Sequence, residues 1–198
     1  MIIKDWKKEI LTIPNLLSFF RLILIPVYMT IYTQAQVSRD YVISGVILAI
    51  SCFTDMIDGK IARSFNMITT FGKFLDPLAD KLTQFALLLC LAIRYPILWA
   101  VFSLFVLKEL FQLFAGIVAA KRGYILKGAL ITGKVCTTVL FISLVAMVIF
   151  PGMSTTVVNA ISLVDGIFLL IAFGDYLITY LCKISRFQPI DDTPSADI

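Results

Sequence analysis

"TDMIDGKIARSFNMITTFGKFLDPLADK", residues 54–81, places Asp55, Asp58, Asp76 and Asp80 in a chain that is 60% hydrophobic. The first two aspartates are three residues apart and the last two are four apart, so each pair shares one face of a helix. Long apolar segments flank the stretch, and only a short turn separates the pairs. The stretch therefore predicts two antiparallel neighbouring helices whose carboxylates face each other across a small gap.

The composition of the chain is typical of a membrane protein. Charged residues make up only 15% of its 198 residues, against about 25% in ordinary soluble domains. A helix needs about 20 apolar residues to cross a bilayer. Residues 1–198 are thus predicted to form a single all-α domain, a polytopic bundle of six transmembrane helices. Their approximate ranges are 14–34, 41–63, 71–93, 97–120, 128–150 and 156–182.

The two ends of the chain differ from this apolar middle. Near the N-terminus, apolar residues that include Trp6 and Ile10 recur at helical spacing against three lysines. This pattern predicts that residues 1–12 form an amphipathic helix lying on an anionic inner leaflet, with a frayed basic tail as the alternative. Residues 187–198 are short, polar and acidic, and are predicted to be disordered.

Lysine and arginine in the connections predict the orientation, because cytoplasmic loops are enriched in both. An even number of spans places both termini on one side of the membrane. The other side carries only Arg39 and Arg94. Both termini and the carboxylate pairs are therefore predicted to be cytoplasmic, in the inner membrane. The ten basic residues on that side are Lys4, Lys7, Lys8, Lys60, Arg63, Lys121, Arg122, Lys127, Lys183 and Arg186.

The composition also excludes several kinds of chemistry. The chain has no histidine, which removes Ser-His-Asp catalysis, Cys-His catalysis and histidine-ligated metals. Its four cysteines stand singly, so neither a zinc site nor a disulfide framework is indicated. A general base must then be a carboxylate, lysine, tyrosine or water. The net charge of +4 is modest, and no nucleic-acid partner is expected.

The presence of four aspartates in so apolar a chain needs a physical explanation. Each costs about 2.5–3.5 kcal/mol at the middle of a bilayer, and carboxylates close together repel one another. Two divalent cations would neutralise all four, and ligands that are all oxygen favour Mg²⁺ or Mn²⁺. Two such metals form a template for in-line displacement at phosphorus. As alternatives, the acids could line the path of a cation-coupled transporter, or pair with Lys60, Arg63, Lys73 and Lys81.

The spacing D-x2-D-G-x2-A-R-x8-G-x3-D-x3-D resembles the signature of the CDP-alcohol phosphatidyltransferases. The resemblance implies an enzyme that moves a phosphatidyl group from CDP-diacylglycerol to an alcohol and releases CMP. It further implies that the aspartates hold two metals and that the last of them also acts as general base. The matching positions are Asp55, Asp58, Gly59, Ala62, Arg63, Gly72, Asp76 and Asp80.

The resemblance also assigns residues to binding of the CDP-lipid. Gly59, Ala62, Arg63 and Gly72 match conserved positions of the signature, and the first three of them match positions that contact the CDP group. An arginine can offer two parallel N–H groups to phosphate oxygens. Thr69 lies in the turn where similar proteins present a hydroxyl to the nucleotide.

A second element lies in the first predicted span. Residues 15–21, NLLSFFR, resemble an Asn-x2-Ser/Thr-x2-Arg element that would direct Asn15, Ser18 and Arg21 toward the same cavity. For the asparagine and the serine, hydrogen bonding between helices is an equally good explanation. The arginine, about two turns into the span, is expected to face a polar cavity and not lipid.

The acceptor is the least determined substrate. "PLADKL" after Asp76 resembles the branch that uses glycerol 3-phosphate or phosphatidylglycerol. Phosphatidylglycerophosphate synthases carry Arg-Glu in span four and Gly-Lys-x-Lys-Thr in span five, where this chain has Lys108-Glu109 and GKVCT. Transfer to glycerol 3-phosphate is the first expectation, and cardiolipin synthesis from phosphatidylglycerol is the alternative. Lys134, Arg122 and Lys108 are the predicted acceptor-binding residues.

Because one substrate is a lipid and the other soluble, the active site is expected to open both to the cytoplasm and sideways to the inner leaflet. The resemblance implies a homodimer, which nothing in the spacing indicates. Glu109, Asp165 and Asp175 are acidic residues within predicted spans, and no role is assigned to any of them.

Overall fold

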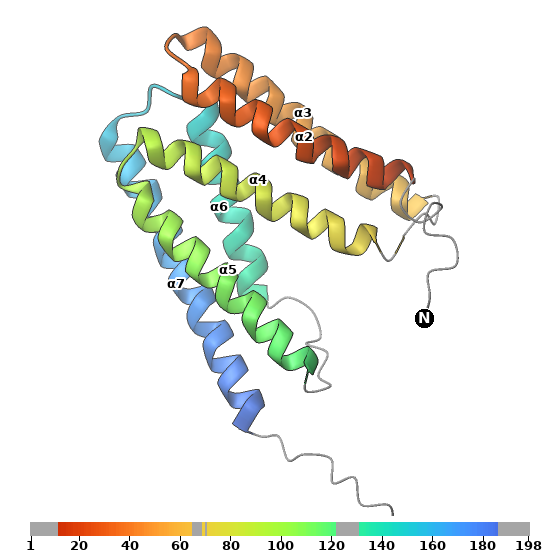
Figure 1. Cartoon of the computed structure of the whole chain (residues 1–198). Coiled ribbons are helices and arrows are strands. Elements are labelled where there is room, and N and C mark those ends of the chain that lie inside the picture. Colours follow the sequence, from red (N-terminus) through yellow and green to blue (C-terminus); the bar gives the residue numbers. More distant parts are fainter. Residues whose placement is uncertain (1–11, 65–68, 70, 122–130, 186–198) are drawn as a thin grey trace, which may run out of the picture.

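The computed structural model describes residues 12–64, 69, 71–121 and 131–185, which form six helices and contain no strand (Figure 1). The predicted interfacial helix and C-terminal tail lie outside the described residues, apart from Thr12, which precedes the first helix. The predicted all-helical fold is confirmed, with helix ends within a few residues of those expected. The helices are α2 Ile13–Gln34, α3 Ser38–Ser64, α4 Gly72–Arg94, α5 Leu98–Lys121, α6 Ile131–Ile149 and α7 Thr155–Ser185.

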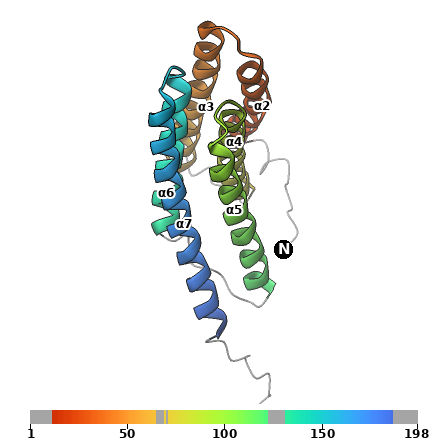
Figure 2. The ribbon, with the colours of Figure 1, turned by 90° about the vertical axis from the view of Figure 1, so that its left-hand side faces the viewer.

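Successive helices run in opposite directions and form two groups. α2 packs against both α3 and α4, while α7 packs against α5 and α6. Contacts of α4 with α5, and of α6 with α3 and α4, join the groups. Figure 1 shows the groups meeting at one end of the molecule and diverging toward the end where α2 begins. In Figure 2, α6 and α7 lie side by side along one edge.

Four of the six described helices are long and apolar enough to cross a membrane: Asn15–Gln34, Leu98–Val118, Ile131–Ile149 and Thr155–Tyr180. α3 and α4, with 27 and 23 residues, are of similar length. They carry the charged residues of the aspartate stretch, which lower their hydropathy. The structure therefore supports a helical membrane protein, and the crossing of the membrane by α3 and α4 stays a prediction.

The end at which the groups meet is fixed by Arg94. Its guanidinium carbon lies 4.2 Å from the ring centroid of Tyr41 in α3, and its Nη2 donates a 2.7 Å hydrogen bond to the carbonyl of Pro151. The hydroxyl of Tyr95 donates to the same carbonyl at 3.2 Å. These contacts join the end of α4 to α3 and to the α6–α7 connection, so this end of the bundle is closed.

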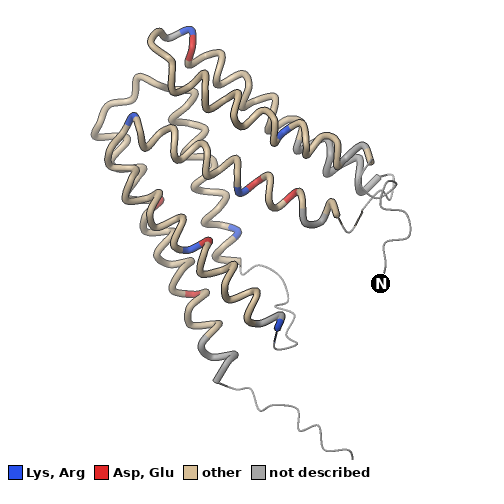
Figure 3. The backbone as a smooth tube through the Cα atoms, viewed as in Figure 1, with Lys and Arg blue, Asp and Glu red and all other residues tan. Residues whose placement is uncertain are grey.

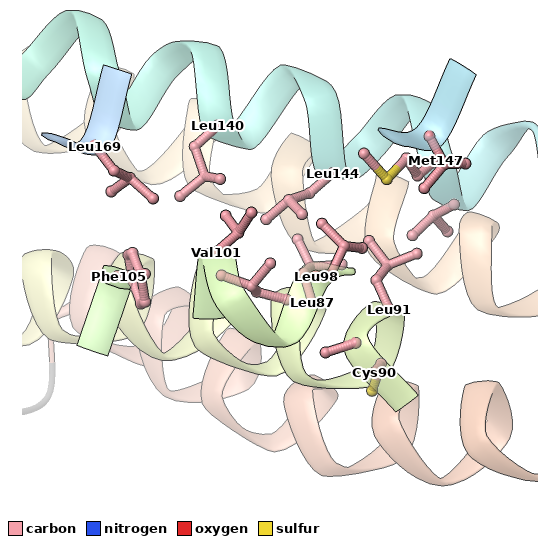
Figure 4. Close-up of a cluster of buried hydrophobic side chains, with 14 of the residues drawn as sticks. Leu87, Cys90, Leu91, Leu98, Val101, Phe105, Leu140, Leu144, Met147 and Leu169 are labelled. Atoms are coloured by element: carbon pink, nitrogen blue, oxygen red, sulfur yellow. The ribbon is translucent and has the colours of Figure 1, made fainter. Parts of the chain in front are cut away.

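The buried apolar core lies in the same half of the molecule (Figure 4). Most of it comes from the second half of α4, from α6 and from the first half of α5, and further core residues come from α7, α2 and α3. Between helices in a membrane such packing stabilises through close van der Waals contact. The opposite half of α4 carries both acidic and basic residues, as Figure 3 shows. Core residues include Leu87, Leu91, Leu98, Val101, Phe105, Leu140, Leu144, Met147 and Leu169.

Candidate active site

The first halves of α2 and α4 face each other through polar side chains. Ser18 Oγ donates a 2.6 Å hydrogen bond to Asp76 Oδ1, and Arg21 Nη1 donates to Asp80 Oδ1. Ser18 and Arg21 are buried, whereas the side chain of Asp80 is 50% exposed. Asp76 and Asp80 thus share one face of α4, as predicted, and the structure gives them partners from α2. Arg21 faces this polar site and not lipid, as expected.

One turn earlier, α2 meets the residues that precede and begin α4. Thr69 Oγ1 accepts hydrogen bonds from Asn15 Nδ2 at 3.2 Å and from the backbone N–H of Gly72 at 2.9 Å. A Cβ atom at Gly72 would lie 2.6 Å from Asn15 Oδ1 and 3.0 Å from Thr69 Oγ1. Glycine is therefore needed here because the side chain of Asn15 approaches the α4 backbone closely.

We expect Gly72→Ala to lower the melting temperature of the purified protein by roughly 2–12 °C. Its methyl group overlaps Asn15, and overpacking of this kind costs about 1–3 kcal/mol. Gly116→Ala is the matched control, because a Cβ at Gly116 meets nothing within 4 Å and alanine favours a helix. Thermal unfolding in detergent measures both variants. Equal melting temperatures for the two variants would contradict the close packing.

The other two aspartates, Asp55 and Asp58, lie in the last three turns of α3, and their side chains are outside the described residues. The same holds for the side chains of Ala62 and Arg63, and the surroundings of Gly59 are not described either. The end of α3 lies near the starts of α2 and α4 (Figure 1). This arrangement places the backbone of the first aspartate pair at the same end of the bundle as the second pair.

The described residues do not by themselves form a metal centre. Among them, no group of three or more histidine, cysteine or acidic side chains lies close enough to hold an ion. Asp76 and Asp80 nevertheless supply two carboxylates on one helix face, with Ser18 and Arg21 orienting one oxygen of each. An all-oxygen donor set of this type suits a hard divalent cation.

A cavity of about 200 Å³ opens beside Asp80. At about 30 Å³ per water molecule, it has room for about six waters or one small polar molecule. Four helices contribute to its wall. Among the described lining residues, the charged ones are the ion pair of Arg21 with Asp80, and most of the others have polar side chains. The lining residues are Arg21, Ser51, Cys52, Asp80, Thr83, Gln84, Thr137, Thr138 and Phe141.

A cluster of charges connects α4 to α5. Glu109 Oε1 lies 2.7 Å from the Nζ atom of Lys81 and 2.7 Å from that of Lys108. Lys108 is 2% exposed, and its Nζ lies 5.6 Å from the ring centroid of Tyr176 in α7. One carboxylate between two ammonium groups leaves a net positive charge. Glu109, to which the sequence assigned no role, holds both lysines in place.

The other predicted acceptor residues are placed less fully. Lys134 is exposed in the first turn of α6, and Arg122 lies outside the described residues. Cys136, which stands where the resemblance expects a second lysine, is 1% exposed. Thr132 donates a hydrogen bond to Asp175 Oδ2, so that this aspartate joins α6 to α7. Asp165 is buried in α7.

Sequence patterns did not identify Gln84 or Lys81 as parts of the site. Gln84 lies one turn beyond Asp80 on α4 and lines the same cavity, so four-residue spacing from the last aspartate could have indicated it. Lys81 was considered only as a partner of the aspartates, whereas the structure pairs it with Glu109. The identity of that partner depends on how α4 and α5 pack.

These observations define a helical membrane protein with a polar, carboxylate-bearing site between α2 and α4. The family model for CDP-alcohol phosphatidyltransferase matches residues 11–173. The chain belongs to this family, as its resemblance to the signature had indicated.

Three relatives illustrate the range of similarity. The chain is 32% identical over 121 residues to a probable phosphatidylglycerophosphate synthase of Mycobacterium tuberculosis, covering 60% of this chain and 58% of the relative. It is 41% identical over 71 residues to a CDP-diacylglycerol–glycerol-3-phosphate 3-phosphatidyltransferase of Rickettsia bellii, covering 35% and 38%. It is 33% identical over 117 residues to a probable CMP-forming cardiolipin synthase of Drosophila melanogaster, covering 59% and 35%. Each match spans less than two thirds of the relative's length.

Proposed function

We propose that the chain transfers a phosphatidyl group from CDP-diacylglycerol to glycerol 3-phosphate, giving phosphatidylglycerophosphate and CMP. Family membership and the names of the relatives support the type of reaction. The observation that carries the proposal is the α2–α4 face, where Ser18 and Arg21 hold Asp76 and Asp80 beside a polar cavity. A cation-coupled transporter, which the acids alone allowed, draws no support from the comparisons.

Asp55, Asp58, Asp76 and Asp80 are the residues that would hold two divalent cations, Mg²⁺ or Mn²⁺. The carboxylates of the second pair lie on one face of α4, and one oxygen of each is already oriented by α2. Bound cations would offset negative charge on the pyrophosphate and on the departing CMP.

Asp80 is also the proposed general base, because the chain has no histidine and this carboxylate reaches the cavity. It would take the proton of the acceptor hydroxyl. The hydroxyl oxygen then bonds to the phosphorus that carries diacylglycerol, and the bond from that phosphorus to the bridging oxygen breaks. CMP leaves with the electron pair. Arg21 positions Asp80 through their ion pair.

Binding of the CDP-lipid is proposed for the signature residues of α3 and for the start of α4. Arg63 would pair with phosphate oxygens. Asn15, Thr69 and Gly72 form one hydrogen-bonded unit that shapes the site at the start of α4. We further propose six membrane spans, an inner-membrane location, cytoplasmic termini and a homodimer. The lysine and arginine distribution supports the orientation.

We expect Lys134→Ala to raise the KM for glycerol 3-phosphate roughly ten- to hundredfold. Charge-assisted contacts contribute about 1.5–3 kcal/mol each, and the acceptor phosphate is a dianion near neutral pH. Lys121→Ala removes another exposed lysine, at the end of α5, and should leave the KM within about threefold of the wild type. Steady-state CMP release measures both. A similar KM for the two variants would remove Lys134 from the acceptor site.

Cardiolipin synthesis from phosphatidylglycerol is the second candidate. The apolar burial of Cys136, where a lysine was expected, favours a less charged acceptor, and one relative is named as a cardiolipin synthase. Thin-layer analysis of labelled product, with CDP-diacylglycerol and each acceptor in turn, separates the two. We expect phosphatidylglycerophosphate to form. Consumption of phosphatidylglycerol alone, with cardiolipin as product, would make the second candidate correct.

A further inference from the structure

The described wall of the cavity beside Asp80 offers several hydrogen-bond acceptors to a molecule that enters it. Thr83, Thr137 and Thr138 each donate their hydroxyl proton to the backbone carbonyl four residues earlier, at 2.8, 3.0 and 2.9 Å. A hydroxyl has one proton but two lone pairs, so these oxygens can still accept. The carboxylate of Asp80 accepts as well.

Gln84 adds an acceptor whose partner is missing. The residue is 8% exposed and lines the cavity. Its Oε1 is buried and receives no hydrogen bond from any part of the chain that the structure describes. Leaving a buried amide oxygen unpaired is unfavourable. The unpaired oxygen therefore indicates that a ligand donates a hydrogen bond to it inside the cavity.

The lining indicates which part of an acceptor could bind here. A phosphate only accepts hydrogen bonds and is negatively charged, so it is poorly matched to Asp80 and the acceptor oxygens around it. Among the described lining residues the only cation is Arg21, and it is already in an ion pair with Asp80. Hydroxyl groups carry no charge and can donate a hydrogen bond to these oxygens. A small polyol is thus the ligand that this cavity suits.

We propose that the cavity binds the free 1,2-diol of a glycerol acceptor and that Gln84 determines specificity for it. The reacting hydroxyl lies at Asp80, and the neighbouring hydroxyl donates to Gln84 Oε1. The acceptor phosphate stays outside the cavity. The same diol occurs on glycerol 3-phosphate and on the headgroup of phosphatidylglycerol. This inference rests on the proposed function and adds the residue that recognises the second hydroxyl.

The test compares glycerol 3-phosphate with 3-hydroxypropyl phosphate, which lacks only the middle hydroxyl. We expect the wild type to prefer glycerol 3-phosphate by about tenfold or more in kcat/KM for CMP release. Gln84→Met keeps the length of the side chain but removes the amide, and should reduce the preference to about threefold or less. Gln112→Met is the matched control. Gln112 also has a buried, unpaired Oε1 among the described residues, but lies on α5 outside this cavity, so its variant should keep the wild-type ratio.

A parallel experiment uses phosphatidylglycerol and its analogue with a 3-hydroxypropyl headgroup. The pair of acceptors that the enzyme consumes shows whether the diol belongs to glycerol 3-phosphate or to the lipid headgroup. An unchanged preference in Gln84→Met would overturn the inference while the proposed function stands. Equal use of the paired acceptors by the wild type would overturn it as well, without any variant. Turnover of neither glycerol acceptor by the wild type would contradict the proposed function and the inference together.

Discussion

Asp76→Asn is expected to reduce CMP release from CDP-diacylglycerol by roughly a hundred- to thousandfold. The change removes one carboxylate charge from the proposed cation site, where the electrostatic stabilisation lost is worth several kcal/mol. Asparagine keeps the size of the side chain and can still accept the hydrogen bond from Ser18. The fold should therefore survive, and the loss should appear in activity and in the concentration of Mn²⁺ needed for half-maximal rate.

The matched control for this variant is Asp40→Asn. Asp40 lies in the first turn of α3, at the opposite end of that helix from Asp55 and Asp58. Its Oδ2 accepts hydrogen bonds from the backbone N–H groups of Gln36 and Val37, which precede the helix. Its replacement should leave the rate within about threefold of the wild type. A fully active Asp76→Asn would contradict the assignment of this carboxylate to a cation.

Asp80→Asn should divide catalysis from binding. General-base catalysis contributes about 10²–10⁴ in rate, so kcat should fall by that factor. The affinity for CDP-diacylglycerol should change much less, because asparagine can still accept from Arg21 and three carboxylates remain. Calorimetric titration without acceptor gives the affinity, and CMP release gives kcat. Equal losses in the two would make Asp80 a cation ligand only.

The shape of the bundle is consistent with the proposed chemistry. Arg94 and the apolar core hold one end closed, whereas the helix groups diverge toward the end that carries the aspartates (Figure 1). A lipid and a soluble acceptor must both reach the same carboxylates. The close apolar packing thus lies in the half of the molecule away from the proposed cation site.

Much of this arrangement could be predicted from local patterns. Apolar runs of sufficient length indicated all six helices, and four-residue spacing put Asp76 and Asp80 on one face of α4. Such features depend on helix geometry alone, which a single sequence reveals directly. The resemblance, in contrast, was what directed Asn15, Ser18 and Arg21 toward one cavity, and the structure gives all three hydrogen-bond partners on α4 or just before it.

Other features depend on which helices meet. The close approach of Asn15 to Gly72 follows from the packing of α2 on α4, and the pairing of Lys81 with Glu109 follows from that of α4 on α5. Neither contact leaves a pattern in the spacing of the chain. Gln84 is intermediate, because its four-residue spacing from Asp80 is visible in the sequence, whereas its unpaired oxygen and the adjoining cavity are visible only in the structure.

The most direct test of the central claim follows CMP and lipid product together, using purified protein, labelled CDP-diacylglycerol and glycerol 3-phosphate. The account predicts that CMP and phosphatidylglycerophosphate form in equal amounts, only when the acceptor and Mg²⁺ or Mn²⁺ are both present. Asp55→Asn should form neither product. Full turnover in excess EDTA, or release of CMP at the same rate without any acceptor, would contradict metal-dependent phosphatidyl transfer at this site.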